Sequence, residues 1–129
     1  MLKLQQISIF MENKPGMLCE ITKFIASKNV NLRALSVADA QDFGIVRIIV
    51  DDPGLVNDIL ANEGYTTKKT YVIGIEIPDQ PGKFSELLEK LAKENINIEY
   101  SYAFTSQEGK AISILRVDDV DKAEKILNN

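Results

Sequence analysis

Two short segments place a Pro-Gly pair between an alternating apolar run and an amphipathic segment. They read ENKPGML at 12–18 and PDQPGKF at 78–84, and the two prolines lie 66 residues apart (positions 15 and 81). Such a joint leaves the first amide N–H groups of the following helix facing outward, beside residues without bulk. A helix end of this kind favours anions, including the carboxylate of a small ligand. One copy would indicate turn chemistry alone, whereas two copies make anion binding a competing interpretation.

Paired carboxylates are the second candidate for chemistry. Asp51-Asp52 and Asp118-Asp119 could serve as acid–base or metal-binding pairs. Each pair stands directly before an expected helix, and Pro53 follows the first, so helix capping is the favoured interpretation. The sequence has no histidine and a single cysteine, Cys19, which we interpret as a packing residue. We therefore expect no catalytic residue, no metal site and no cofactor, and a protein that is not an enzyme.

The composition narrows the possible partners. The chain has 129 residues, of which 45% are hydrophobic and 26% charged, and a formal net charge of −4, which argues against a nucleic-acid-binding protein. The longest apolar run, FGIVRIIV, is short and contains Arg47, so we expect no membrane span. Gln5 and Gln6 interrupt the apolar start, unlike a signal peptide, and a lone cysteine fits a reducing compartment. We expect a cytoplasmic protein.

The elements around the joints repeat. At a spacing of 66, the alternating residues Ile7, Ile9 and Met11 correspond to Ile73, Ile75 and Ile77, as in strands with one buried face. Apolar residues at helical spacing follow each joint, and KNVNL (28–32) then matches ENINI (94–98), with an asparagine where each helix should end. After the next turn the second copy has gained one residue, and the spacing becomes 67.

Each copy therefore reads strand, helix, strand, strand, helix. A fourth strand is expected at 66–70 in the first copy, whereas the second copy reaches Asn129 where that strand should begin. The order βαββαβ predicts the α+β class, with two ferredoxin-like repeats whose antiparallel sheets carry their helices on one face. We predict one domain at 1–70 and another at 71–129, the second with its fourth strand missing or truncated.

The alternation also predicts an apolar second sheet face in the first copy. The residues expected there are Phe10, Leu35, Val37, Ile45 and Ile49. This is more apolar surface than a free monomer exposes, so we expect a homodimer. In the second copy Tyr100, Tyr102 and Phe104 form an aromatic stripe in phase with Ile98, which favours core or interface packing over RNA stacking.

The combination of an alternating strand, ENKPGML and a helix ending in KNVNL resembles an ACT domain, and PDQPGKF with ENINI resembles a second one. The resemblance covers essentially the whole chain, although Asp79 and the truncated second copy depart from the family pattern. It implies regulatory modules that pair side by side and bind amino acids or similar effectors at the domain interface, where the joint of one domain faces the second strand of its neighbour.

Carried over to this sequence, the resemblance implicates both joints and the starts of both second strands. The residues are Asn13, Lys14, Pro15, Gly16, Met17 and Leu18, then Asp79, Gln80, Pro81, Gly82, Lys83 and Phe84, and from the second strands Asn31, Leu32, Asn97 and Ile98. Backbone N–H groups at 16–18 would hold a carboxylate, and Asn13 and Asn31 would offer amide groups. Asn31 and Asn97 could equally be strand-entry residues that are satisfied locally.

The two copies are not equivalent in charge. Arg33 in the first copy corresponds to Glu99 in the second, and opposite charges there favour pairing of one copy with the other, the alternative being edge charges that discourage aggregation. Asn13 is neutral, whereas Asp79 would repel a carboxylate, pair with an α-amino group or cap its own helix. We expect the first joint, facing Asn97 and Ile98, to form the stronger site.

Two functions follow from the resemblance. The first is a regulatory protein that binds a small molecule, most simply an amino acid, without a cofactor. The second is a regulatory subunit of a separately encoded amino-acid-metabolic enzyme, comparable to the small subunits of acetohydroxyacid synthase. The two are compatible, because an effector needs a target on which to act.

Overall fold

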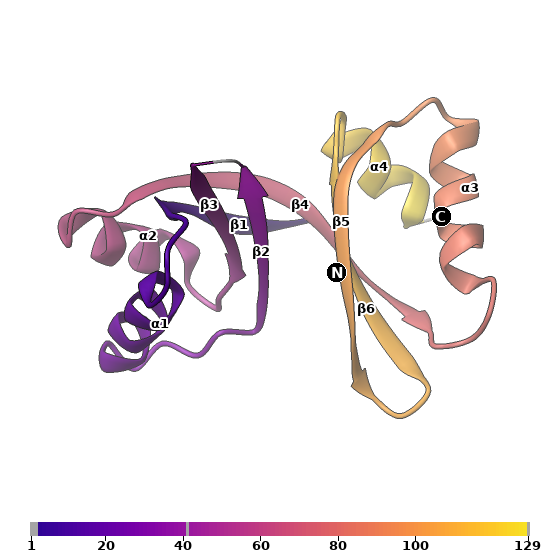
Figure 1. Ribbon diagram of the computed structural model, residues 1–129. Helices are drawn as coiled ribbons and strands as arrows, with labels where there is room; N and C mark the ends of the chain where they lie inside the picture. The colour runs from indigo at the N-terminus through magenta and orange to yellow at the C-terminus, as the bar shows by residue number, and fades with distance from the viewer. Residues whose placement is uncertain (1–2, 41, 129) are drawn as a thin grey trace. The chain divides into compact units, whose positions relative to one another are not determined.

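The computed structural model describes residues 3–40 and 42–128 (Figure 1). These residues form six strands and four helices, and hydrogen bonds between strands give the order β2-β3-β1-β4-β6-β5. The elements are β1 Lys3–Glu12, α1 Met17–Ser27, β2 Ala34–Ala40, β3 Phe43–Ile49, α2 Pro53–Asn62, β4 Thr66–Pro78, α3 Lys83–Lys93, β5 Ile98–Gln107, β6 Lys110–Val117 and α4 Val120–Leu127. The chain thus has the two strand-helix-strand-strand-helix repeats that the sequence predicts.

The chain divides into two compact units. One holds residues 5–70, and the other holds residues 71–129 with the start of the chain through Leu4. These units differ from the predicted ranges 1–70 and 71–129 in the assignment of the first four residues. We call them the first and the second repeat.

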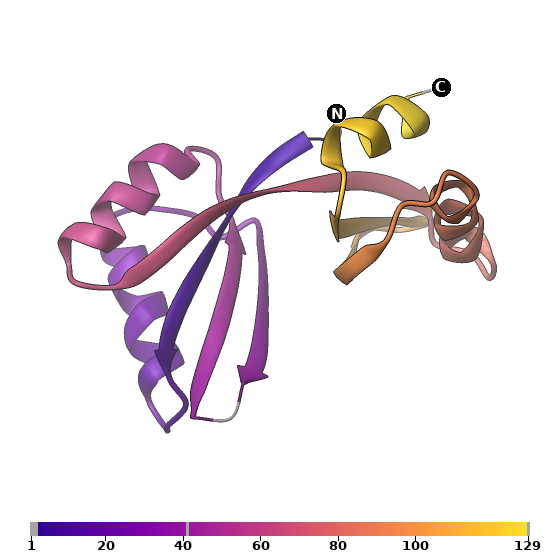
Figure 2. The same cartoon turned by 90° about the horizontal axis from the view of Figure 1, so that it is seen from above.

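The first repeat has its core between one sheet face and helices α1 and α2, which lie on the same side of β1, β2 and β3 (Figure 2). Antiparallel pairing sets Ile7 opposite Ile48 and Ile9 opposite Val46, and all four side chains are buried. The helices contribute Ile21, Ile25, Val56 and Leu60 to the same cluster. The amphipathic spacing in the sequence therefore reflects helices that cover one sheet face.

The second repeat is built in the same way. Helices α3 and α4 lie on the same side of β5 and β6 (Figure 1), and β6 pairs antiparallel with both β4 and β5. The buried cluster on the helix side contains Ile73, Leu87, Leu91, Ile96, Leu115, Val117 and Ala123. Both helices that follow a joint have eleven residues and begin 66 residues apart, so the repeats can be compared position by position.

Strand β4 is one continuous strand where the sequence predicted two separate strands. The sequence indicated a strand at 66–70 and a separate one through Ile73 and Ile77, yet thirteen residues from Thr66 to Pro78 are continuous. The intervening polar residues do not interrupt the strand, because 66–73 contains neither glycine nor proline and is rich in threonine, tyrosine and β-branched residues that favour extended backbone.

The start of β1 supplies contacts that the second repeat would otherwise lack. β1 is the neighbour of β4 in the strand order, so Lys3 and Leu4 take up the side of β4 where a fourth strand belongs. The Lys3 backbone N–H donates to Glu124 Oε2 at 3.1 Å, and Lys3 Nζ donates to Asp121 Oδ1 at 2.9 Å. The hydrogen bond to Lys3, reinforced by its charge, lowers the pKa of Asp121, and the same bond raises the pKa of Lys3.

The side chains of β2 lie on the opposite sheet faces from those predicted. Leu35 pairs with Ile48 and Val37 with Val46, which places Leu35 and Val37 on the helix side of the sheet. They are nevertheless 39% and 47% exposed. The assignment to the second face was wrong because β2 begins only at Ala34, after a bend at Arg33, so the alternation does not carry over from Leu32.

The aromatic stripe of β5 also faces the other way. Tyr102 pairs with Ile114 and Phe104 with Ile112, opposite in facing to the core residue Leu115. A register shift between Ile98 and Tyr100 adds one residue, and a single inserted residue moves all later side chains to the opposite face. The expected phase with Ile98 was therefore wrong, and the shift occurs at Glu99, the position that corresponds to Arg33.

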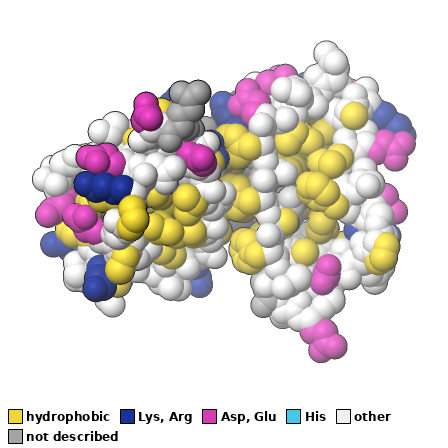
Figure 3. All heavy atoms as spheres, in the orientation of Figure 1, with side chains coloured by type: hydrophobic (Ala, Val, Ile, Leu, Met, Phe, Trp, Pro, Cys, Tyr) yellow, Lys and Arg dark blue, Asp and Glu magenta, His cyan; other side chains and the backbone are white. Residues whose placement is uncertain are grey.

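The predicted second face of the first repeat is confirmed for the remaining three residues. Phe10 pairs with Ile45, and Ile49 pairs with Ala34, all out of phase with the helix-side residues Ile7 and Val46. Buried polar side chains, Gln6 and Ser8, lie on this face as well. Acidic and basic side chains are mixed over the visible surface of each repeat, without a large field of one sign (Figure 3).

Candidate functional site

The first joint ends in a glycine-capped helix. Gly16 is the N-cap of α1 with φ +90° and ψ −15°, in the left-handed region that favours glycine. The Glu20 N–H donates to the Gly16 carbonyl at 2.9 Å as the first bond of the helix, and no side chain of the described residues hydrogen-bonds this end. By helix geometry the amides of Leu18 and Cys19 therefore point out of the helix end without an intrahelical acceptor.

A carboxylate from β2 lies beside this joint. Asn13 Nδ2 donates to Asp39 Oδ1 at 3.0 Å, and Lys14 Nζ lies 3.2 Å from Glu12 Oε2. The Asn13 amide nitrogen is thus already engaged, whereas its oxygen can still accept. Asp39 was not among the expected site residues. It brings a negative charge to the joint that was expected to be the neutral one.

The second joint repeats the backbone of the first. Gly82 caps α3 with φ +85°, the Glu86 N–H donates to the Gly82 carbonyl at 3.0 Å, and no side chain caps the helix. The backbone N–H of Asp79 donates to the Gly109 carbonyl at 3.0 Å. Because no described side chain hydrogen-bonds the start of α3, Asp79 does not cap its own helix, which was one of its expected uses. Lys83 Nζ lies 3.5 Å from Glu86 Oε2.

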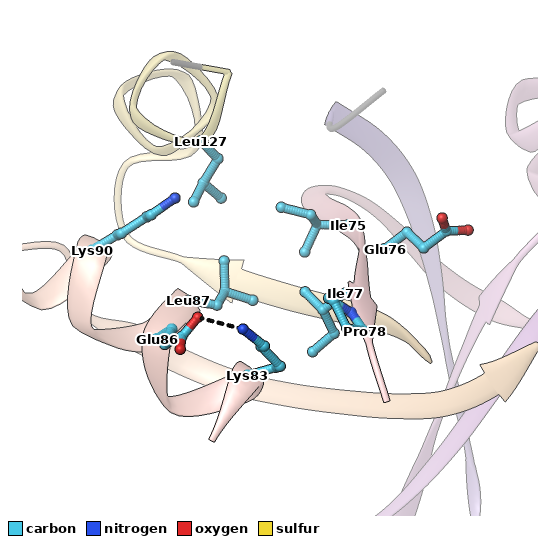
Figure 4. Close-up of a pocket in the computed structure, with 9 residues that line it drawn as sticks. All are labelled: Ile75, Glu76, Ile77, Pro78, Lys83, Glu86, Leu87, Lys90 and Leu127. Atoms are coloured by element: carbon cyan, nitrogen blue, oxygen red, sulfur yellow. Dashed lines mark hydrogen bonds and ion pairs between the residues drawn. The ribbon is translucent and has the colours of Figure 1, made fainter. Parts of the chain in front are cut away.

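A hollow borders the second joint. It has a volume of about 210 Å³ and lies between the last residues of β4, one side of α3 and the end of α4 (Figure 4). Its lining includes two residues of the second joint, Pro78 and Lys83, with apolar side chains from all three elements. Sequence reasoning did not anticipate this hollow.

A family model for an ACT domain pair matches residues 2–129. The chain belongs to the ACT domain pair family. This establishes that the two repeats are ACT domains with the ferredoxin-like plan, as the joints and the periodicity indicated. A search of curated proteins gave no match.

Solved structures share this fold. Protein BT0572 from Bacteroides thetaiotaomicron is 38% identical over 98% of this chain and 87% of that chain, with a TM-score of 0.91. The ligand-free regulatory subunit of aspartate kinase from Thermus thermophilus is 13% identical, with 98% and 92% coverage and a TM-score of 0.66. Aspartate kinase from Clostridium acetobutylicum, described as an allosteric enzyme, is 16% identical over 98% of this chain and 32% of that chain, with a TM-score of 0.61.

The second-strand residues of each ACT repeat lie away from that repeat's own joint. Asn31 is exposed in the segment after α1, at the opposite end of this eleven-residue helix from Gly16, about 16 Å away along its axis. The Asn97 N–H donates to Asp118 Oδ1 at 3.1 Å, and the Asp118 N–H donates back to the Asn97 carbonyl at 3.1 Å. The backbone N–H and C=O of Asn97 therefore both have hydrogen-bond partners within the second repeat. The facing of each joint to the neighbouring domain's second strand stays a prediction.

The apolar candidates belong mainly to the cores of their own repeats. Leu18 and Leu32 pack against the first core and Ile98 against the second. Met17 is half-buried, and Phe84 is 37% exposed. Lys14, Pro15, Gln80 and Pro81 are exposed turn residues.

The charged pair expected between the two ACT repeats has partners within them. Arg33 Nε lies 3.1 Å from Asp51 Oδ1 in the first repeat, and Glu99 Oε1 lies 3.3 Å from Arg116 Nε in the second. Any pairing of Arg33 with Glu99 would have to compete with these contacts. It stays a prediction.

The paired carboxylates have structural partners. Asp52 accepts from the Leu55 N–H at 3.2 Å and Asp119 from the Lys122 N–H at 3.1 Å, so both cap helices as expected. Their neighbours, Asp51 and Asp118, hold Arg33 and the Asn97 amide. Within 3–40 and 42–128, Cys, Asp and Glu side chains form no cluster of three or more that could hold a metal ion. None of the helices in these ranges is both long and apolar enough to span a bilayer.

Proposed function

We propose that this ACT domain pair is a regulatory protein that binds an amino acid at its Pro-Gly joints. The observation that carries the proposal is the repeated helix end, where a left-handed glycine replaces any capping side chain at both Gly16 and Gly82. By contrast, aspartate side chains cap α2 and α4. The two helix ends without a side-chain cap leave amide donors for an external carboxylate.

Asp39 extends the proposal to a zwitterionic ligand. A carboxylate held by the outward-pointing amides at the start of α1 would bring an α-ammonium group within reach of the joint's side chains. Asp39, 3.0 Å from Asn13, supplies a negative charge of the kind that pairs with an ammonium group. The free Asn13 oxygen can accept a further hydrogen bond. An amino acid suits this joint better than a simple monocarboxylate, which Asp39 would repel.

The second joint carries Asp79 where the first carries Asn13, and we retain the expectation that it binds more weakly. Asn97 and Ile98 remain the proposed contacts from the neighbouring domain for the first joint, and Asn31 and Leu32 for the second. The proposed assembly is a homodimer in the cytoplasm, without nucleic acid or membrane partners.

A second candidate is a regulatory subunit that acts on a separately encoded amino-acid-metabolic enzyme. It is favoured by the fold shared with the aspartate kinase regulatory subunit. The small subunits of acetohydroxyacid synthase, which the resemblance to ACT domains brought in as an example, are a second model for a regulatory subunit of this kind. Both candidates use the same effector sites, and in both the regulation acts on another protein.

Calorimetry with a panel of amino acids tests the proposal on two matched variants, Gly16→Val and Gly82→Val. The two glycines have nearly equal φ, and a Cβ would meet no atom within 4 Å at either, so both substitutions impose comparable backbone strain. We expect Gly16→Val to abolish binding and Gly82→Val to change it less, with circular dichroism unchanged. Two equal sites, or binding that survives Gly16→Val, would contradict the assignment.

A further inference from the structure

The hollow in the second repeat has an apolar floor and a charged rim. Ile75 and Ile77 of β4, Leu87 of α3 and Leu127 of α4 form the floor, and Figure 4 shows these side chains converging from three elements. Lys83, Glu86 and Lys90 lie around them, whereas the side chain of Glu76 points away from the hollow. Pro78 completes the lining.

The first repeat fills the corresponding space with aromatic rings. At the spacings of 66 and 67, the floor residues correspond to Ile9, Met11, Ile21 and Leu60. Ile9, Ile21 and Leu60 are fully buried there. Phe24 and Tyr65 pack against this cluster with ring centroids 5.8 Å apart. The space that is open in one repeat is therefore closed by two aromatic rings in the other.

One substitution favours this opening in the second repeat: Lys90 stands where Phe24 stands in the first. Ile75 and Leu127 are only half-buried, although their counterparts Ile9 and Leu60 have no exposed surface, whereas Ile77 is half-buried like its counterpart Met11. Partly exposed apolar side chains around a hollow gain from a ligand that covers them.

Among the described charged residues that line the hollow, Lys90 is the one without an ion-pair partner. Lys83 lies 3.5 Å from Glu86, and Glu76 lies 3.4 Å from Lys110. Lys90 makes no ion pair with another described residue, and Figure 4 shows its side chain extending over the hollow toward Leu127. A lysine in such a position is a point charge for a carboxylate.

We propose that this hollow binds a small aromatic carboxylate, with its ring on the apolar floor and its carboxylate at Lys90. The volume of about 210 Å³ exceeds the roughly 150 Å³ that suffices for benzene in a dry protein cavity. The ring takes the place that aromatic side chains take in the first repeat. This site is separate from the helix-end amides at Gly16, and its binding chemistry does not depend on the proposed function, although Pro78 and Lys83 of the second joint contribute to its lining.

Titration of the labelled protein with phenylacetate, followed by amide NMR, tests this site. We expect saturable shifts at Ile75, Leu87 and Leu127 with a millimolar dissociation constant. Phenylacetamide has the same shape without the charge, and it should bind about five- to tenfold more weakly. Lys90→Met should weaken phenylacetate to the same extent and leave phenylacetamide unchanged.

Matched variants test separately whether binding depends on the charge of Lys90 and on the open space of the hollow. Lys93→Met lies one turn further along α3, where Lys93 pairs with Glu89 and does not line the hollow, and it should change neither affinity. Lys90→Phe restores the residue of the first repeat, and it should abolish binding of both probes. Gly16→Val should leave phenylacetate binding intact, which distinguishes this site from the first joint.

Three results would overturn the proposal. One is equal affinity for phenylacetate and phenylacetamide together with no effect of Lys90→Met. Another is a set of shifts confined to residues outside the lining, or no saturable shift. The third is binding of an extended peptide along β4 without binding of phenylacetate, which would assign the hollow to the addition of a strand.

Discussion

Truncating the two corresponding leucines, Leu60 and Leu127, should have unequal costs. Leu60 has no exposed surface and lies in a filled core, so Leu60→Ala removes a packed side chain and leaves a cavity. Such changes cost about 3 to 4 kcal/mol of unfolding free energy. Leu127 is half-buried and borders a hollow that already exists, so its side chain loses fewer contacts. We expect about 1 to 2 kcal/mol for Leu127→Ala.

Urea unfolding followed by circular dichroism measures the loss of unfolding free energy in each variant. The two variants can be compared if their unfolding free energies fall with urea concentration at equal slopes. The two variants should differ by about 2 kcal/mol, which is the magnitude expected from the difference in packing. Equal costs would refute the reasoning, because they would mean that the floor of the hollow is as closely packed as the core of the first repeat.

Two further predictions concern the N-terminal contact and assembly. Because the pKa of Asp121 is lowered in the fold, its contribution to stability is present above its ordinary value of 3.8 and is lost as the pH falls through the folded pKa. Asp121→Asn should therefore flatten the acid side of a stability–pH profile, whereas the exposed change Asp58→Asn on α2 should not; parallel profiles would contradict the contact. The exposed Leu35 and Val37, on the helix side of the edge strand β2, predict a homodimer, so sedimentation at micromolar concentration should give a dimer that Val37→Lys weakens. A monomeric wild type would exclude it.

Much of the local structure could be predicted because it depends on residues close in sequence. Asn29 and Asn95 end their helices with φ +58° and +59°, as the left-handed preference of asparagine indicated. Asp52 caps α2, and both joints begin helices at equivalent positions. Each signal was strengthened by its occurrence in both copies.

The faces of the second strands could not be predicted, because a single irregular residue decides them. The break occurs at Arg33 in one repeat and Glu99 in the other, and it inverts the facing of Leu35, Val37 and the aromatic stripe. Periodicity shows that a strand alternates, and it does not show where the alternation restarts.

The remaining features depend on contacts between distant residues. Asp39 meets Asn13 across 26 positions, and Lys3 meets Asp121 across 118. The hollow arises from the absence of a ring at Lys90, which reads in the sequence as an ordinary exposed helix position. No local pattern could identify any of these three.

The glycine-capped joints have a consequence for how two copies of one module diverge. A helix end that offers backbone donors keeps them whatever side chains surround it, because every residue except proline carries an N–H. The side chains have changed from Asn13 to Asp79, from Lys14 to Gln80 and from Met17 to Lys83, while both glycines keep the same backbone conformation. Mutation can therefore change the side chains around each proposed site without removing its backbone donors. In this chain the two copies thus share a backbone conformation and differ in the side chains beside it.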